Sequence, residues 1–266
     1  MTEDDESDRY RAPALDKGLD ILELLAGIDG GVTQAEIAKR LGRGPNEFYR
    51  MLDRLVRRGY VTRIEGDRYA LTLKLFGLAQ LHAPVRRLAA YATPLMRELA
   101  VLSKQANHLC VFDRGAVVVV AQQEAPEYWG VSIRVGSHMS LFNTGSGHVL
   151  MAFRSQEERS LMIAEYERHA DDNPEPGNYR DKLEEIRRRG FEIMPSAQTA
   201  GVFNISAPVL GPDGRAIAAV TCPYLQVLSL PDAPAIEDVC RMLVVAAHKL
   251  SQLSGADVRQ AGPEKE

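Results

Sequence analysis

Residues 14–71 contain the pattern that most restricts how this chain can fold: three short amphipathic helices followed by a hairpin signal. The first helix is expected over residues 14–26, where leucines recur at helical spacing. Thr33 opens the second helix with a capping box, and two glycines end that helix just before Pro45, a suitable first residue for the third. The stretch 60–71 then has the composition of a β-hairpin. This order of elements predicts a winged helix-turn-helix domain.

Charge is distributed unevenly along the chain. The formal net charge is -4, yet residues 31–71 carry nine Lys and Arg against five Asp and Glu, and the first eight residues hold five acids. A basic module beside an acidic tail is typical of nucleic-acid recognition, whereas a solvated charged helix in an ordinary helical domain is the alternative. We expect this module to bind a double-stranded DNA operator. The candidate DNA-binding residues are Thr33, Arg43, Asn46, Glu47, Tyr49, Arg50, Arg54, Arg63 and Arg68.

The rest of the chain predicts a helical linker and a second domain. Residues 73–104 are mostly helical in pattern, interrupted by Pro84 and Pro94, and beyond them strand patterns alternate with helix patterns on what should be one sheet. The expected strands are 108–112, 117–122, 131–135, 202–210 and 215–224, and the expected helices are 145–153, 155–170, 179–190 and 236–250. Ser155 and Glu158 form a capping box at the start of the second of these helices. The fold class is therefore α+β. The expected parts are a disordered acidic tail (1–12), the winged helix-turn-helix domain (13–72), the linker (73–104), an α+β sensor-like domain (105–254) and a second disordered tail (255–266).

Several segments resemble the IclR family of bacterial transcriptional regulators, and the resemblance runs from about residue 14 to residue 254. In chain order they read ALDKGLDILELL, TQAEIAKRLG, FYRMLDRLVRRGYV, YALT, VGSHMSLFNTGSGHVLMAF and GVFNISAPVLGPDGRAIAAVT. Each segment is degenerate alone, whereas their order and spacing make the match specific. The resemblance implies a helical linker and a C-terminal GAF-like domain that binds a small organic effector, often a carboxylate. It also implies a homodimer or tetramer.

Residues 143–147 are the centre of the candidate effector site. Their backbone amides open a helix, and with the helix dipole they suit an anion or a carbonyl; simple capping by Thr144 is the alternative. The family resemblance places Asn204 and Thr221 opposite this loop. Family members often carry an Asp where this chain has Met194, so we expect an aromatic or longer aliphatic acid as effector. The effector-binding candidates are Trp129, Thr144, Gly145, Ser146, Met194, Asn204 and Thr221.

Two further departures from the family concern Asn46-Glu47, where members often have Ser-Thr, and Asn204, where members often have Cys. The first predicts that this chain reads a different base sequence. After the Gly-Ser pair that precedes the candidate site, family members often have a basic residue, and this chain has His138. These changes affect which effector and which operator are bound, not the presence of the two sites.

An enzymatic function is disfavoured, because the chain lacks GxSxG, HExxH, a Walker loop and a dinucleotide fingerprint. The alternative is a metal-dependent or Cys/His enzyme of small-molecule metabolism that carries the winged helix as an interaction module. A pure adaptor also remains open, since a winged helix does not guarantee DNA binding. No spacing demands a metal, and we expect neither metal nor cofactor. The residues that could approach one another are His108, Cys110, His138, His148 and Cys222.

Compartment and assembly follow from simpler features. No apolar run approaches the ~18 residues of a membrane span, and the acidic N-terminus does not resemble a secretory signal. Three cysteines, an odd number, fit a reducing compartment, so we expect a cytoplasmic protein without membrane contact. A dimer is expected because one winged helix reads only a half-site. Its candidate contacts are Leu75, Leu78, Leu81, Leu95 and Leu99, for which packing within one chain is the alternative.

Overall fold

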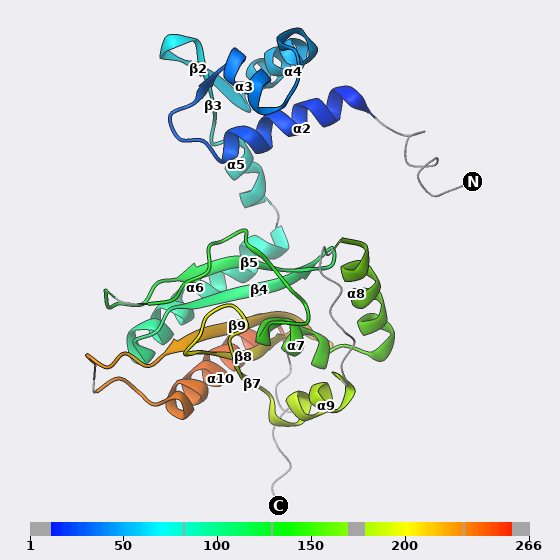
Figure 1. The fold of residues 1–266 in the computed structure, drawn as a ribbon. Coiled ribbons are helices and arrows are strands. Elements are labelled where there is room, and N and C mark those ends of the chain that lie inside the picture. The colour runs from blue at the N-terminus through cyan, green and yellow to red at the C-terminus, as the bar shows by residue number, and fades with distance from the viewer. Residues whose placement is uncertain (1–11, 82, 129, 170–178, 231, 257–266) are drawn as a thin grey trace, which may run out of the picture. The chain divides into compact units, whose positions relative to one another are not determined.

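The computed structural model describes residues 12–81, 83–128, 130–169, 179–230 and 232–256 (Figure 1). The chain divides into two compact units, Met1–Ala83 and Pro84–Glu266, and each is described by itself. Almost all of the two expected tails lies outside the described residues. Within those residues, no helix is both long enough and apolar enough to cross a membrane.

In the N-terminal unit, α2, α3 and α4 pack around one apolar core beside a small antiparallel sheet, as predicted for a winged helix-turn-helix domain. The predicted capping box is confirmed: the Thr33 hydroxyl accepts a hydrogen bond from the N–H of Glu36, whose carboxylate accepts one from the N–H of Thr33. Phe48 and Leu52 of the third helix are fully buried in the core. The elements are α2 (Pro13–Ala26), β1 (Val32–Thr33), α3 (Gln34–Arg40), α4 (Pro45–Arg57), β2 (Val61–Ile64), η2 (Glu65–Asp67), β3 (Arg68–Leu71) and α5 (Lys74–Leu81).

The wing is the antiparallel hairpin of β2 and β3, with β1 on the other side of β3. The chain reverses at Gly66 with φ of 71°, a left-handed conformation that glycine adopts at little cost. Gly31 is also required to be glycine, because a Cβ at this position would lie 2.8 Å from the carbonyl oxygen of Tyr69. The loop before β1 therefore packs directly on the backbone of the wing.

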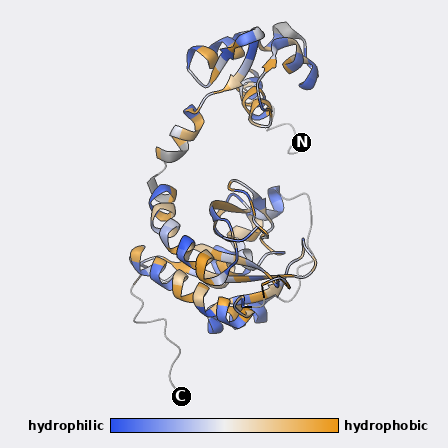
Figure 2. Ribbon diagram, turned by 90° about the vertical axis from the view of Figure 1, so that its left-hand side faces the viewer, coloured by the Kyte–Doolittle hydropathy of each residue, from blue (hydrophilic) through white to orange (hydrophobic). Residues whose placement is uncertain are grey.

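The C-terminal unit is a six-stranded antiparallel sheet with strand order β6-β5-β4-β9-β8-β7 and helices on both faces (Figure 1). Side chains of α6 and α10 form one core with the first face, and those of α7, α8 and α9 form another with the second. Both hydrophobic and hydrophilic residues occur along these helices, as expected for elements that cover a sheet (Figure 2). The elements are α6 (Ala83–Ser103), β4 (Asn107–Asp113), β5 (Ala116–Gln123), β6 (His138–Met139), α7 (Gly145–Ala152), α8 (Gln156–His169), α9 (Tyr179–Arg189), β7 (Glu192–Pro195), β8 (Val202–Leu210), β9 (Ala216–Leu225) and α10 (Ile236–Leu253).

One predicted strand is wrong. Residues 131–134 alternate in burial, and Ile133 packs into the second core, but residues 131–135 form no ladder with a neighbouring strand. Backbone pairing with β5 starts only at Gly136 and Ser137, which bond to Val119, and the strand β6 is limited to two residues. The alternation thus reports side-chain burial without strand pairing.

The linker also differs from the prediction. Pro94 lies inside α6, which continues through it, because Leu88, Met96 and Leu99 of this helix are buried against the sheet and outweigh the loss of one N–H donor. Leu99 and the partly buried Leu95 belong to this core. For these two leucines the structure supports packing within one chain, the alternative to contact with a second chain.

The first turn of α8 holds the second capping box expected from the sequence. Ser155 and Glu158 cap each other, with the N–H of Ser155 donating to the Glu158 carboxylate and the N–H of Glu158 donating to the Ser155 hydroxyl. Arg154 and Arg215 also donate to that carboxylate. The backbone hydrogen bond first, and the two guanidinium groups in addition, lower the pKa of Glu158 to about 2.

This lowered pKa predicts an acid-sensitive contribution to stability. A carboxyl with a depressed folded-state pKa stabilises the fold above its unfolded pKa of about 4.5, and the contribution is lost as the pH falls toward about 2. The Glu158→Gln variant should therefore lose less stability than the wild type over this pH range, as measured by thermal unfolding. Glu157→Gln, next to it on α8, is the matched control and should follow the wild type; equal slopes for wild type and Glu158→Gln would contradict the prediction.

Candidate functional site

The helix α4 has one buried and one exposed side. Gly44 precedes it, and its N–H donates to the carboxylate of Glu47, a hydrogen bond that lowers the pKa of Glu47. Tyr49, Arg50 and Arg54 lie on the exposed side. Within the described residues these three side chains make no hydrogen bond or ion pair, so their polar groups are available to another molecule.

Other predicted DNA-binding residues already have partners in the N-terminal unit. Thr33 caps α3, Arg43 pairs with Asp20 at 3.0 Å, and Glu47 pairs with Lys17 at 3.4 Å besides capping α4. The two ion pairs join α4 and the turn before it to α2. Sequence reasoning assigned these residues to DNA, whereas the structure gives each of them a role within the fold.

In the wing, too, one predicted DNA-binding arginine is held within the fold and the other is exposed. Arg68 donates to the carbonyl oxygen of Gly31 through both Nε, at 3.1 Å, and Nη2, at 2.8 Å, which ties the wing to the loop before β1. Arg63 forms only an exposed ion pair with Asp67, which costs little to break. The side chain of Asn46 lies outside the part of the chain that the structure describes.

The second candidate site begins with a row of polar residues across the C-terminal sheet. Glu192 of β7 pairs with Ser206 of β8, Ser206 with Thr221 of β9, Thr221 with His108 of β4, and His108 with Gln122 of β5. Residues paired directly across antiparallel strands point to the same face of the sheet. This face is the one that α7 covers, because Ser146 of α7 contacts Thr221.

The helix α7 packs unusually closely on this face. All eight of its residues are buried, and a Cβ on Gly145 would lie 2.6 Å from Oγ of Ser206. A Cβ on Gly147 would lie only 2.1 Å from the carbonyl oxygen of Leu141. Thr144 caps the helix by accepting a hydrogen bond from the N–H of Gly147. Glycine is therefore required where the helix starts, and the N-terminus of α7 lies directly above the polar row.

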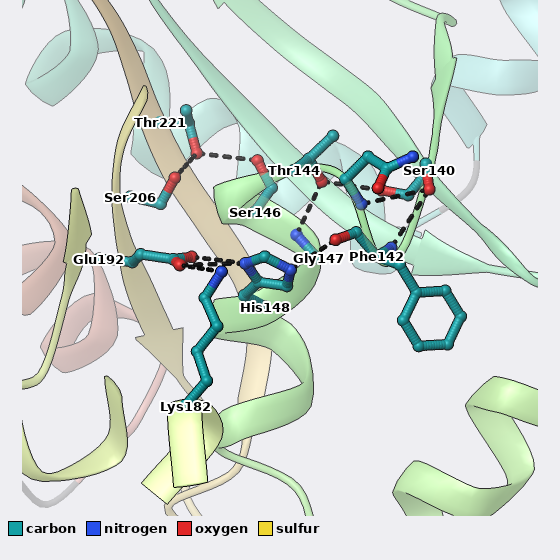
Figure 3. Close-up of polar contacts among 11 residues, drawn as sticks. Ser140, Phe142, Thr144, Ser146, Gly147, His148, Lys182, Glu192, Ser206 and Thr221 are labelled. Atoms are coloured by element: carbon teal, nitrogen blue, oxygen red, sulfur yellow. Dashed lines mark hydrogen bonds and ion pairs between the residues drawn. The ribbon is translucent and has the colours of Figure 1, made fainter. Parts of the chain in front are cut away.

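Three hydroxyl groups link the helix to the sheet (Figure 3). Oγ1 of Thr221 lies 2.8 Å from Oγ of Ser146 and 2.8 Å from Oγ of Ser206. Each hydroxyl can both donate and accept, so this buried chain satisfies itself. The backbone amides at the start of α7 lie next to it.

One end of the polar row is ionic. Nδ1 of His148 lies 2.9 Å from the Glu192 carboxylate, which also accepts from Nζ of Lys182 at 3.0 Å (Figure 3). Nε2 of His148 lies 2.6 Å from the carbonyl oxygen of Phe142. Both ring nitrogens thus face oxygen acceptors, and a proton on each nitrogen satisfies both contacts. The imidazole holds the loop before α7 and the strand β7 together.

The structure brings together Thr144, Gly145, Ser146 and Thr221 of the predicted effector residues. Asn204 and Met194 are paired in the register of β7 and β8, one step along the same face from Glu192 and Ser206. Trp129 lies outside the described residues. Sequence reasoning missed Ser206 and Gln122, and it weighed His108 and His148 only for a metal or catalytic site. The two-residue spacing of Asn204 and Ser206 on one predicted strand was the signal that could have found Ser206.

In the described part of the chain, no group of three or more His, Cys, Asp and Glu residues is placed to hold a metal ion. Cys110 and Cys222 belong to the cores on opposite faces of the sheet, so they cannot share one centre. Burial raises the pKa of the Cys110 thiol to about 12 and raises that of Cys222 as well, which keeps both as neutral thiols. Both nitrogens of His148 are engaged by Glu192 and Phe142.

A winged helix-turn-helix unit followed by an α+β unit with a polar site under a helix N-terminus defines a class of ligand-responsive DNA-binding regulators. Comparison with known proteins supports this assignment. Residues 14–65 match the IclR helix-turn-helix domain, and residues 82–252 match the C-terminal domain of bacterial IclR transcriptional regulators. The chain belongs to the IclR family of transcriptional regulators, which are not enzymes.

Individual relatives support the same assignment. The transcriptional regulator BhcR of Paracoccus denitrificans is 31% identical over 215 residues, which cover 78% of this chain and 76% of that protein. The regulator KdgR of Escherichia coli is 27% identical over 85% of this chain and 86% of its own length. A solved IclR homologue of Microbacterium hydrocarbonoxydans, in complex with 4-hydroxybenzoate, has the same fold with a TM-score of 0.73, 22% identity, and coverage of 90% of this chain and 98% of that one.

Proposed function

We propose that this regulator binds a DNA operator through α4 and the wing, and that a small organic acid bound on the α7-covered face of the sheet changes the affinity for that operator. The observation that carries the proposal is the exposed side of α4, where Tyr49, Arg50 and Arg54 have no partner within the described residues. Arginine can bond guanine or phosphate with two parallel hydrogen bonds.

Gel-shift titration of the DNA upstream of its own gene tests the first half of the proposal. We expect binding whose affinity falls steeply as salt rises, because each phosphate contact releases a counterion. A protein that acts only as an adaptor would not bind this DNA more tightly than an unrelated duplex of equal length.

The effector half of the proposal rests on the opening amides of α7 and the hydroxyls beside them. A ligand carboxylate fits amides at a helix N-terminus. Because the Microbacterium homologue was solved with 4-hydroxybenzoate, aromatic acids come first in a thermal-shift screen of small organic acids. A true effector must change operator affinity by the same factor by which the operator changes effector affinity, which calorimetry with and without operator DNA can measure.

Asn204 provides a specific prediction for the effector site. Its side chain is only 8% exposed, shares a face with Ser206 and makes no side-chain hydrogen bond within the described residues. Replacing Asn204 with Ala should cost about 1–3 kcal/mol of effector affinity by calorimetry, with unchanged operator affinity in the absence of effector. Gln252→Ala, exposed on α10, is the control. Wild-type effector affinity in both Asn204→Ala and Ser146→Trp would place the site elsewhere.

We also propose that the chain acts as a dimer or tetramer and that α5 takes part in the contact. Leu75, Leu78 and Leu81 of α5 are 38%, 44% and 69% exposed, which is costly for a helix left in water. The double variant Leu78→Glu with Leu81→Glu should scatter light as a smaller species and lose operator affinity. Leu161→Glu, on an equally exposed leucine of α8, should keep the wild-type mass. A monomeric wild type that binds operator would contradict this proposal.

A further inference from the structure

Two buried polar atoms on the α7-covered face of the sheet have no hydrogen-bond partner within the described residues. They are Nδ1 of His108, a side chain that is 1% exposed, and Nε2 of the partly buried Gln122. Such unpaired groups are rare in folded proteins, and each requires an explanation. The rest of the polar row, from Glu192 through Ser206 to Thr221, is fully paired.

The two unpaired groups are neighbours. His108 and Gln122 are opposite each other in the register of β4 and β5, and His108 is opposite Thr221 on its other side. Adjacent strands lie about 4.8 Å apart, so Gln122 is roughly 10 Å across the sheet from Thr221. A small ligand with a polar group at each end can therefore reach from the start of α7 to His108 and Gln122.

The chemistry of the pair selects a neutral partner. Nε2 of Gln122 can only donate, whereas a neutral imidazole has one donor and one acceptor nitrogen. Burial lowers the pKa of His108 to about 4, which keeps its ring neutral. A hydroxyl group can accept from Gln122 and donate to Nδ1 of His108 at the same time. A carboxylate in this position would be a buried anion beside a neutral ring, and the ammonium group of Lys182 lies at the opposite end of the row.

We propose that His108 and Gln122 bind a hydroxyl group of the effector, so that the effector is a hydroxy-substituted carboxylic acid with its carboxylate at the start of α7 and its hydroxyl across the sheet. This inference rests on the proposed function, since it names the chemical class of the effector. It assigns ligand contacts to two residues of β4 and β5, beyond those near α7, β8 and β9.

Two pairs of acids, each differing by one hydroxyl, test this inference on the full-length protein by calorimetry: benzoate with 4-hydroxybenzoate, and hexanoate with 6-hydroxyhexanoate. In at least one pair the wild type should bind the hydroxylated acid at least about tenfold more tightly, because a site built to hydrogen-bond a hydroxyl discriminates against the analogue that lacks it. Gln122→Met and His108→Phe should reduce this preference to within about twofold, because neither variant retains the polar group that bonds the hydroxyl.

Gln123→Met is the matched control, because Gln123 is the next residue on β5 and faces the opposite side. It should keep the wild-type preference. Without ligand, Gln122→Met should have an unchanged or higher melting temperature, since it removes an unpaired buried donor. A clear drop in that temperature would show that the amide has a structural partner and would overturn the inference.

The remaining outcomes separate this inference from the proposed function. If the acids bind without preference for the hydroxyl, the inference is wrong and the effector proposal stands. If no acid of either pair binds at millimolar concentration, the hydroxy-acid assignment is wrong. The proposed function is then judged separately, by whether any other acid in the thermal-shift screen stabilises the protein and changes operator binding.

Discussion

Replacing Arg50 with glutamate is expected to abolish specific operator binding at moderate salt while leaving the protein folded. Arg50 is exposed on α4 and has no partner within the described residues, so the fold does not depend on it. Loss of one arginine contact to a base or phosphate costs about 1–3 kcal/mol, and the new carboxylate adds repulsion from the phosphates. Gel-shift titration at two or more salt concentrations measures both the loss and the change in salt dependence.

The control for this variant has to carry the same change in charge. Arg97 is exposed on α6, and Arg97→Glu should bind the operator with wild-type affinity. Circular dichroism checks that both variants keep the helical content of the wild type. A folded Arg50→Glu protein with unchanged operator affinity would refute the assignment of α4 as the recognition helix.

Replacing Glu192 with alanine should destabilise the C-terminal unit by about 1–3 kcal/mol, the typical cost of leaving a buried polar group without its hydrogen-bond partner. The carboxylate of Glu192 is 6% exposed and contacts both His148 and Lys182. Lys182 is 42% exposed and can turn toward water, so most of the cost comes from His148, which would keep a buried nitrogen without an acceptor. Urea unfolding of the full chain, followed by the fluorescence of its one tryptophan, measures the change.

Two further variants distinguish the buried pair from ordinary charge effects. Glu192→Gln keeps one oxygen acceptor for His148 and should lose less stability than Glu192→Ala. Glu185→Ala removes the partner of Arg188 on the surface of α9, where an ion pair contributes about 0–1 kcal/mol. Equal unfolding midpoints for Glu192→Ala and Glu185→Ala would mean that the His148 contacts do not stabilise the fold.

Local signals in the sequence predicted most of the fold. The capping residues Thr33 and Ser155 each mark a helix start that the structure confirms, because caps act over three or four residues. Predictions failed where partners are distant along the chain. Residues 131–135 have the alternation of a strand but no neighbour that pairs with them, and the short strand β7 was not predicted because its pairing with β8 supplies the regularity.

For the candidate sites as well, local features could be predicted from the sequence and contacts between distant residues could not. The exposed face of α4 followed from helical periodicity alone, so Tyr49, Arg50 and Arg54 could be found from the sequence. The partners of Arg43 and Arg68 could not, since they depend on side chains and backbone 23 and 37 residues away. Likewise, the polar row depends on the register of five strands, which no single segment specifies.

The edges of the C-terminal sheet have a consequence for aggregation. β6, at one edge, is two residues long, and β7, at the other, is four residues long and ends with Pro195, which has no N–H to offer. Short edge strands and edge prolines give an incoming strand of another molecule few backbone groups to pair with. Fibrillar growth by strand addition is thus disfavoured at both ends of the sheet, and surfaces built from helices remain the better route for ordered self-association.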